Sequence, residues 1–280
     1  MSSGNKSVAS AYTLIRRPEV KTALWGDEAS GFVHDLYYIG NDDMAFLTVT
    51  MPSGTKYRSS ERFRSVLGSY NCIYMLSGQL TLQNPSNGEV VTANERDSIL
   101  IPPNTWYHGY NFGTGDAQFI ECIAPRIDRA ATEKLRKPDR VLGWVASSAD
   151  NWPDHTAKGS MRLTRCANAL GAIIGSENSV LAAVLASVKA VSFAVLTLPA
   201  VSRSEIISFP HGVCYHGDSG AISIELIGDS ASYLAVDKAD VLYLPAGSRH
   251  RLFNHSSSVR TIHVGGSGSF GAIAICEPAA

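Results

Sequence analysis

The sequence predicts an all-β fold made of two tandem copies of one unit. Turn-forming stretches such as MPSG, NPSNG, PPN, GTG, HGDSG and PAGS recur at short intervals, and Val, Ile, Leu, Tyr and Thr fill the segments between them. This rhythm is typical of many short antiparallel strands. Three stretches of the first half also recur, in the same order, in the second half. A shared order of matches indicates that the chain arose by duplication.

The three matches define the repeat. MAFLTVTMP at 44–52 matches VSFAVLTLP at 191–199, an offset of 147 residues. GQLTL matches GAISI, and PPNTWYH matches LPAGSRH, each with an offset of 142, so that His108 aligns with His250. The change from 147 to 142 indicates that the first copy has five extra residues in the loop that follows the first match. We therefore expect the two copies to differ in that loop.

A charged segment separates the two copies. RIDRAATEKLRKPDR is rich in Arg, Lys and Asp and poor in strand-forming residues, and DRAATEKLRK can form a short helix. We predict an N-terminal barrel over 1–125, which holds the functional pocket, and a linker with a short helix over 126–160. A C-terminal barrel follows over 161–280, and we expect it to be degenerate.

Composition limits the classes of partner. The chain has 280 residues and a formal net charge of -1, with Lys and Arg (24) nearly balancing Asp and Glu (25). No basic field is available to hold nucleic acid or an anionic membrane, so a small molecule is the expected partner. The N-terminal stretch has no secretory pattern, and Lys189, Ser192 and Pro199 interrupt the longest apolar region. We expect a cytoplasmic protein whose five cysteines, which form no CxxC pair, are reduced.

Both repeats carry a stretch that resembles the second sequence motif of cupins. That motif runs Asp, four residues, Pro-x-Gly, two residues, His, three residues, Asn, and DVLYLPAGSRHRLFN from Asp240 to Asn254 matches all of it. SILIPPNTWYHGYN keeps Pro103 and His108, with Thr105 at the glycine position. The chain is thus similar to bicupins over most of both copies. The resemblance implies two antiparallel jelly-roll barrels, each with a pocket between its sheets, and a homodimer.

The first cupin motif, by contrast, is degenerate in both copies. In the family, a His-x-His pair and a Glu from this motif join the histidine of the second motif to hold iron, manganese, nickel or zinc. The Glu position is Asn71 in the first copy and Val213 in the second. The two histidine positions fall near Arg64 and Val66 in the first copy and near Ile206 and Ser208 in the second. One imidazole per barrel supplies too few donors for a divalent ion, so we expect no metal.

Iron or manganese would need unusual ligands. In the first barrel these are His108 with Glu61 or Cys72. In the second they are His250 with His211, His216 or Cys214. Arg64 opposes such a site, because its permanent positive charge repels a metal ion and suits an anionic or carbonyl-bearing ligand better.

The first barrel is the better candidate for a working pocket. Side chains alternate along a strand, so that Trp106 and Tyr110 point inward if His108 does. The predicted site has His108 as its catalytic residue and a substrate-binding set of Arg64, Asn71, Ile73, Met75, Trp106 and Tyr110. Core packing is the alternative for the aromatic and apolar members, and a hydrogen-bonded remnant of a metal site is the alternative for His108.

Three functional hypotheses follow from this pocket. The first is a metal-independent enzyme, of isomerase, dehydratase or cyclase type, in which His108 moves a proton on a small ring-bearing carbonyl or carboxylate substrate. The second is an iron- or manganese-dependent dioxygenase or decarboxylase of an aromatic or keto-acid substrate, which the cupin resemblance implies. The third is a non-catalytic small-molecule-binding or scaffold protein, because fold alone does not determine function.

Overall fold

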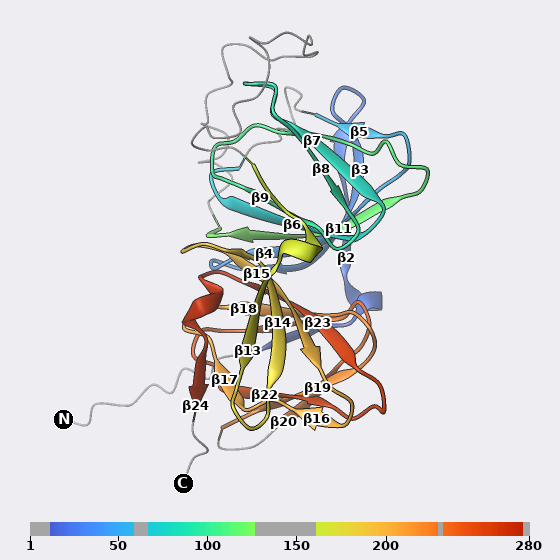
Figure 1. Cartoon of the computed structure of the whole chain (residues 1–280). Helices are drawn as coiled ribbons and strands as arrows, with labels where there is room; N and C mark the ends of the chain where they lie inside the picture. The colour runs from blue at the N-terminus through green and yellow to red at the C-terminus, as the bar shows by residue number, and fades with distance from the viewer. Residues whose placement is uncertain (1–11, 59–66, 127–160, 229–231, 277–280) are drawn as a thin grey trace, which may run out of the picture.

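The structure is a computed structural model that describes residues 12–58, 67–126, 161–228 and 232–276. These residues form two stacked β-barrels (Figure 1). They contain strands and short 3-10 turns, and among them there is no α-helix. The predicted all-β fold with two tandem barrels is confirmed. The expected helix at DRAATEKLRK lies outside the described residues, as does the predicted linker except for Arg126.

Two antiparallel sheets form the first barrel. The larger, seven-stranded sheet has the order β12 (Arg162–Thr164), β9 (Ser98–Ile101), β6 (Tyr70–Ser77), β11 (Ala117–Ala124), β4 (Ala45–Met51), β3 (Gly31–Gly40) and β2 (Lys21–Asp27). The smaller, four-stranded sheet has the order β5 (Lys56–Tyr57), β10 (His108–Tyr110), β7 (Gln79–Gln83) and β8 (Val90–Asn94). Leu47, Ile73, Leu82 and Phe119 belong to the core between these sheets. The strands that carry these residues thus turn an apolar face toward the barrel interior.

The second barrel repeats this plan. Its seven-stranded sheet has the order β1 (Thr13–Ile15), β21 (Val241–Leu244), β18 (Val213–Gly217), β23 (Arg260–Gly266), β15 (Ser192–Leu198), β14 (Val180–Ser187) and β13 (Leu170–Ile174). Its six-stranded sheet contains β20 (Ser232–Val236), β19 (Ile222–Leu226), β22 (His250–Asn254), β17 (Ile206–Ser208) and β24 (Ala274–Cys276), with β16 (Ser202–Arg203) also paired to β22. The 3-10 turns are η1 (Arg17–Glu19), η3 (Cys166–Asn168) and η4 (Phe270–Ala272). In the described part of the chain, no helix reaches the length and apolar character of a membrane span.

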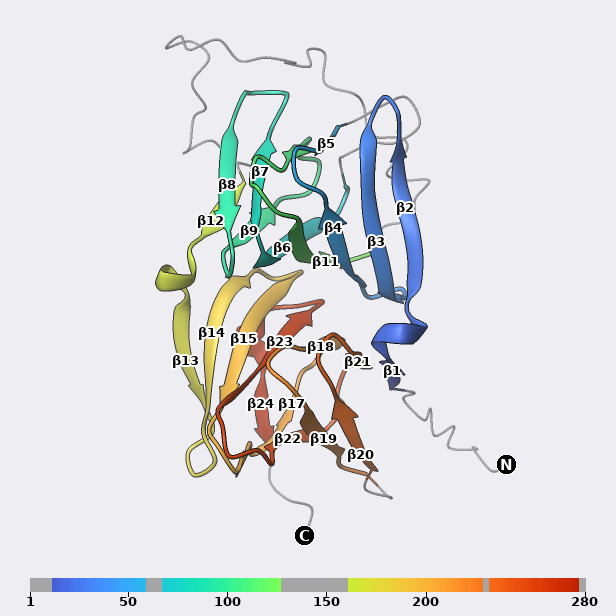
Figure 2. The same cartoon turned by 90° about the vertical axis from the view of Figure 1, so that its right-hand side faces the viewer.

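The two barrels exchange one strand each. β1, near the start of the chain, pairs with β21 of the second barrel, and β12 pairs with β9 of the first (Figure 2). An equivalent ion pair follows each exchanged strand and ties it to the other barrel. Arg16 Nη1 lies 2.6 Å from Asp240 Oδ2, and Arg165 Nη1 lies 2.6 Å from Asp97 Oδ2. The predicted domain boundaries did not include this exchange, which links the two barrels through backbone hydrogen bonds.

The large sheets of the two barrels also share a core. Phe46, Tyr74 and Cys122 from the first barrel and Phe193 and Val241 from the second belong to one buried cluster. The rings of Tyr74 and Phe193 stack with centroids 4.9 Å apart. The central strands of each large sheet are therefore buried on both faces, one toward their own barrel and one toward the other barrel.

Strand alternation in β18 decides where two of the alternative metal ligands lie. Tyr215 belongs to the interior of the second barrel, so its neighbours Cys214 and His216 face the first barrel. His216 Nδ1 lies 3.0 Å from His263 Nδ1, and burial lowers the pKa of both imidazoles to about 3. A metal site that combines His250 with His216 or Cys214 is therefore wrong, because these side chains lie on opposite faces of the sheet.

Candidate active site

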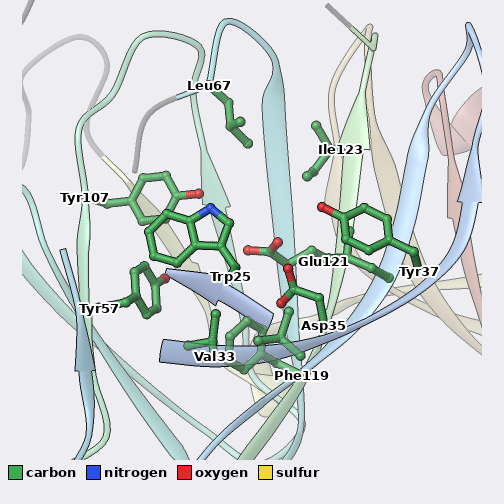
Figure 3. A pocket seen from close by; sticks show the side chains of 12 residues that line it. Trp25, Val33, Asp35, Tyr37, Tyr57, Leu67, Tyr107, Phe119, Glu121 and Ile123 are labelled. Atoms are coloured by element: carbon green, nitrogen blue, oxygen red, sulfur yellow. The ribbon is translucent and has the colours of Figure 1, made fainter. Parts of the chain in front are cut away.

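A pocket lies on the inner face of the large sheet of the first barrel (Figure 3). Its cavity volume is about 110 Å³. Sites for drug-sized ligands begin at roughly 300 Å³, so only a small ligand fits this cavity. Its lining consists of Trp25, Val33, Asp35, Tyr37, Leu47, Val49, Tyr57, Leu67, Tyr107, Phe119, Glu121 and Ile123. Apolar and aromatic walls with a few polar groups are typical of small-molecule sites.

Two carboxylates enter this pocket from strands that flank β4. Asp35 on β3 pairs with Val49, and Glu121 on β11 pairs with Leu47. Paired residues share a face of the sheet, and residues two apart on β4 share one as well. Both carboxylates therefore project to the same side, where they lie next to each other (Figure 3).

The pocket raises the pKa of both carboxylates. Burial raises the pKa of Asp35 to about 8, and the nearby Glu121 carboxylate adds to the rise. Burial also raises the pKa of Glu121 to about 7, although a hydrogen bond from Asn71 favours its charged form. Both carboxylates line the pocket, where Asp35 is only 5% exposed and Glu121 is half-buried. At neutral pH, Asp35 therefore holds its proton more firmly than Glu121 does.

Asn71 connects Glu121 to Tyr107. Its Nδ2 donates to Glu121 Oε1 at 2.9 Å and to Tyr107 OH at 3.4 Å. Because the Tyr107 oxygen accepts this bond, its own O–H can donate to a ligand in the pocket. Burial raises the pKa of Tyr107 and of Tyr57 well above the ordinary phenol value, so both hydroxyls stay protonated.

Aromatic rings in edge-to-face contact form one wall of the pocket. The centroids of Trp25 and Tyr57 are 5.8 Å apart at an interplanar angle of 80°, and those of Tyr57 and Tyr107 are 6.2 Å apart at 89°. Gly109 makes room for this arrangement, since a Cβ at that position would clash with the ring of Tyr57. The wall is therefore fixed by packing before any ligand binds.

Backbone geometry corrects the alignment of the second cupin motif in the first copy. Asn104 has a φ of 62° and donates its N–H to Leu67 O at 2.7 Å. Gly247, the motif glycine of the second copy, has a φ of 78° and donates its N–H to Phe209 O at 2.7 Å. The two residues are equivalent, because few residues other than glycine, asparagine and aspartate adopt a positive φ at low cost. The motif glycine position is thus Asn104, one residue before the predicted Thr105.

This equivalence shifts the whole motif of the first copy by one residue. The motif proline becomes Pro102, and the residue equivalent to His250 becomes Tyr107. The shifted motif also has the required three residues before Asn111, a spacing that His108 does not have. The predicted alignment of His108 with His250 is wrong, because two consecutive prolines allowed either register.

His108 itself lies on the face of β10 opposite to the pocket. Gly109 pairs with Leu82, a core residue of the barrel, so the adjacent His108 projects from the other face. Burial and the charge of Arg58 lower the pKa of His108 to about 4, and its Nε2 has no hydrogen-bond partner among the described residues. The expectation that His108 points into the barrel is wrong, since a one-residue slip turns each side chain to the other face.

The other predicted site residues do not form one group. Ile73 and Met75 are fully buried in the core of the first barrel. Trp106 is buried but does not line the pocket, and Tyr110 lies on the outer face of β10. Arg64 lies outside the described residues, so its role stays a prediction. Asn71 is thus the predicted residue that contacts the carboxylate pair.

The second barrel lacks the polar groups of the first. Strand registers give the equivalents of Asp35, Asn71 and Glu121 as Ala182, Val213 and Val264. The buried imidazole of His250 donates from Nδ1 to Ser248 O at 2.9 Å, so its Nε2 accepts from Tyr215 OH at 2.7 Å. Its hydrogen-bonding groups are satisfied within an apolar core.

Asp35 and Glu121 are functional candidates that the sequence analysis did not identify. Each is a lone carboxylate in an apolar strand, in FVHDLYYIG and AQFIECIA respectively. A comparison of the two copies position by position provides a signal, because apolar residues replace both carboxylates in the second copy. The repeat was aligned only over its three strongest matches, and neither strand was among the residues considered for the site.

The described residues do not fit the metal sites of the family. No group of three or more His, Cys, Asp or Glu side chains in the described ranges could hold a metal ion. The motif histidine position is Tyr107, and the motif glutamate position is Asn71, whose amide is hydrogen-bonded in the pocket. Cys72 faces the core between the barrels, and Glu61 lies outside the described residues. The two pocket carboxylates supply fewer oxygen ligands than iron or manganese usually has.

Comparisons with known proteins identify the fold. No family model matches the sequence, and no curated protein matches it either. Among solved structures, an oxalate decarboxylase of Lactobacillus farciminis in complex with formate is similar at a TM-score of 0.68, with 10% sequence identity over 97% of this chain and 90% of that chain. An oxalate decarboxylase of Bacillus subtilis, described with Mn(II) centres, is similar at a TM-score of 0.67, with 12% identity over 97% of this chain and 80% of that chain. The chain therefore has a bicupin fold, as predicted.

Proposed function

We propose that this bicupin is an enzyme that moves protons on a small, ring-bearing carbonyl substrate in its N-terminal barrel, without a metal. The observation that carries the proposal is the pair of carboxylates in one pocket, with pKa values of about 8 for Asp35 and about 7 for Glu121. Acid and base groups work best when their pKa values lie near the working pH. Two carboxyl groups held at different pKa values can serve as acid and base at once.

Each pocket residue then has a distinct role. Ionised Glu121 takes a proton from the carbon next to the substrate carbonyl, and protonated Asp35 returns a proton to a neighbouring atom of the substrate. The hydroxyls of Tyr57 and Tyr107 donate hydrogen bonds to the carbonyl oxygen and stabilise the negative charge that develops there. The aromatic wall restricts the ring of the substrate to one plane. Isomerisation, dehydration and cyclisation all use such steps.

An exchange assay tests this proposal without knowledge of the natural substrate. We expect the protein to catalyse exchange of α-protons of cyclic ketones for deuterium in D₂O, followed by NMR. Glu121→Gln should lower the rate by about 10²- to 10⁴-fold, the usual contribution of a general base. The rate should rise with pH as Glu121 ionises near pH 7 and fall as Asp35 loses its proton near pH 8.

Two variants serve as controls in this assay. Asp42→Asn removes an exposed carboxylate outside the pocket and should leave the rate unchanged. His108→Ala separates the present proposal from the predicted role of His108. If His108→Ala abolished exchange while Glu121→Gln retained it, the acid and base roles proposed for the carboxylates would be refuted.

Iron- or manganese-dependent decarboxylation or dioxygenation is the second candidate, and the manganese centres of the Bacillus subtilis structural neighbour favour it. This candidate requires ligands beyond the two carboxylates. Metal analysis of protein purified without chelators, followed by assays with added Mn(II) or Fe(II), distinguishes it from the first. Stoichiometric metal that is essential for turnover would favour the second candidate. Ligand binding with no turnover under either condition would favour a non-catalytic binding protein.

A further inference from the structure

The N-terminal pocket holds two carboxyl groups that can ionise. Asp35 and Glu121 both line it, and no Lys or Arg of the described residues does. Asp35 is 95% buried from solvent, faces the cavity (Figure 3), and has no hydrogen bond or ion pair with another described residue. A buried carboxylate without a hydrogen-bond donor or cation is unfavourable when it ionises. Among the described residues no side chain supplies that donor, and a ligand with a donor or a positive charge would do so.

The aromatic wall suits a cation as well. Trp25, Tyr57 and Tyr107 lie on one side of the carboxylates, and Tyr37 lies on the other (Figure 3). Tryptophan and tyrosine rings attract a cation placed over their faces, and this attraction grows when water is excluded. Anionic side chains and several aromatic rings around one cavity are a general recognition pattern for ammonium groups.

We infer that the N-terminal pocket recognises a small ligand that carries a protonated amine, whose ammonium group lies between the Asp35 and Glu121 carboxylates and the aromatic wall. This inference rests on the proposed function and names its substrate class: a ring-bearing carbonyl compound with an amino group.

Charge and coordination chemistry argue against other ligand classes. An anionic ligand would be repelled by any ionised carboxylate in the pocket. A divalent metal commonly requires three or more donors, whereas an ammonium group has three N–H donors that match carboxylate oxygens and do not require fixed coordination geometry. The second barrel provides an internal contrast, since Ala182 and Val264 occupy the positions of Asp35 and Glu121 there.

Ammonium binding should release protons. The titratable groups that face the site are Asp35 from β3, Glu121 from β11, Tyr37 from β3, Tyr57 from β5 and Tyr107 ahead of β10. The tyrosines stay protonated, and Glu121 has the lower pKa of the two carboxyl groups. A neighbouring cation favours the charged form of a carboxylate, so Glu121 is the source of the released proton, while Asp35 keeps the proton that the proposed catalysis requires.

Calorimetry of the full chain with three ligands of similar size tests the inference. The probes are benzylamine, which is cationic at pH 7.5, benzyl alcohol, which is neutral, and benzoate, which is anionic. We expect benzylamine to bind at least tenfold more tightly than benzyl alcohol, and benzoate to show no binding. Titrations in two buffers of different ionisation enthalpy should show proton release with benzylamine alone.

Matched variants locate the binding site. Glu121→Gln keeps the shape of the side chain and removes its charge, so it should lower the ratio of benzylamine affinity to benzyl alcohol affinity at least tenfold. Asp35→Asn replaces a carboxyl group that is protonated at this pH, so it should lower that ratio less. Asp42→Asn, which changes an exposed carboxylate, should have no effect on either ligand. Thermal unfolding of each variant confirms that it is folded at the titration temperature.

The outcomes separate this inference from the proposed function. Benzyl alcohol or benzoate binding as tightly as benzylamine would refute the cationic ligand class, even if the protein exchanges α-protons of neutral ketones. Absence of benzylamine binding at millimolar concentrations would refute it too. Tight, carboxylate-dependent benzylamine binding without proton exchange on any ketone or aminoketone would support the ligand class and refute the proposed catalysis.

Discussion

Removing the charge of Asp35 should stabilise the protein at alkaline pH. Its pKa is about 8 in the folded chain, against an ordinary value of 3.8. Below about pH 4 the carboxyl group is protonated in both the folded and the unfolded state. Between pH 4 and pH 8 the unfolded chain loses this proton while the folded chain keeps it, so the free energy of unfolding falls as pH rises.

The size of this effect follows from the pKa difference. A shift of about four units corresponds to roughly 5 kcal/mol at 1.36 kcal/mol per unit. Asp35→Asn has no proton to lose, so its stability relative to the wild type should increase by an amount on the order of 5 kcal/mol between pH 4 and pH 9. The buried amide of the variant adds a cost of about 1–3 kcal/mol that does not depend on pH. The test therefore measures how the difference in free energy of unfolding between Asp35→Asn and the wild type changes with pH.

Urea unfolding at a series of pH values provides the measurement. The wild type, Asp35→Asn and the exposed-site control Asp42→Asn are compared under identical conditions. The control should follow the wild type at every pH. A stability difference between Asp35→Asn and the wild type that stays constant within about 1 kcal/mol from pH 4 to pH 9 would refute the argument, because Asp35 would then ionise as readily in the folded chain as in the unfolded one.

Two further substitutions test the packing of each barrel. Gly109→Ala should destabilise the first barrel by about 1–3 kcal/mol in urea unfolding, because the added Cβ clashes with the ring of Tyr57. Gly115→Ala has open space around its Cβ and serves as the control, so equal losses in both variants would contradict the steric explanation. Tyr215→Phe should cost about 1–3 kcal/mol in the same assay, because it leaves His250 Nε2 buried without a donor. Ligand binding in the first barrel should not change in Tyr215→Phe, and a loss of binding there would show that the two interiors are coupled.

Local sequence signals were sufficient to predict the architecture. Turn residues at short intervals and the matched stretches of the two copies predicted two all-β barrels, and the intact motif from Asp240 to Asn254 predicted the bicupin fold. These features depend on neighbours along the chain, since turn residues and strand alternation act over a few positions. The same local reasoning did not resolve the first copy, where Pro102 and Pro103 permit two registers.

Only the tertiary structure decided which residues form the pocket. Asp35 and Glu121 are far apart in sequence and meet because β3 and β11 both pair with β4. Burial raises both pKa values, and the nearby Glu121 carboxylate adds to the rise at Asp35. Neither burial nor this proximity is a property of local sequence. A shift of one residue in register likewise exchanged His108 for Tyr107 at the inward position, since adjacent strand residues face opposite sides of a sheet.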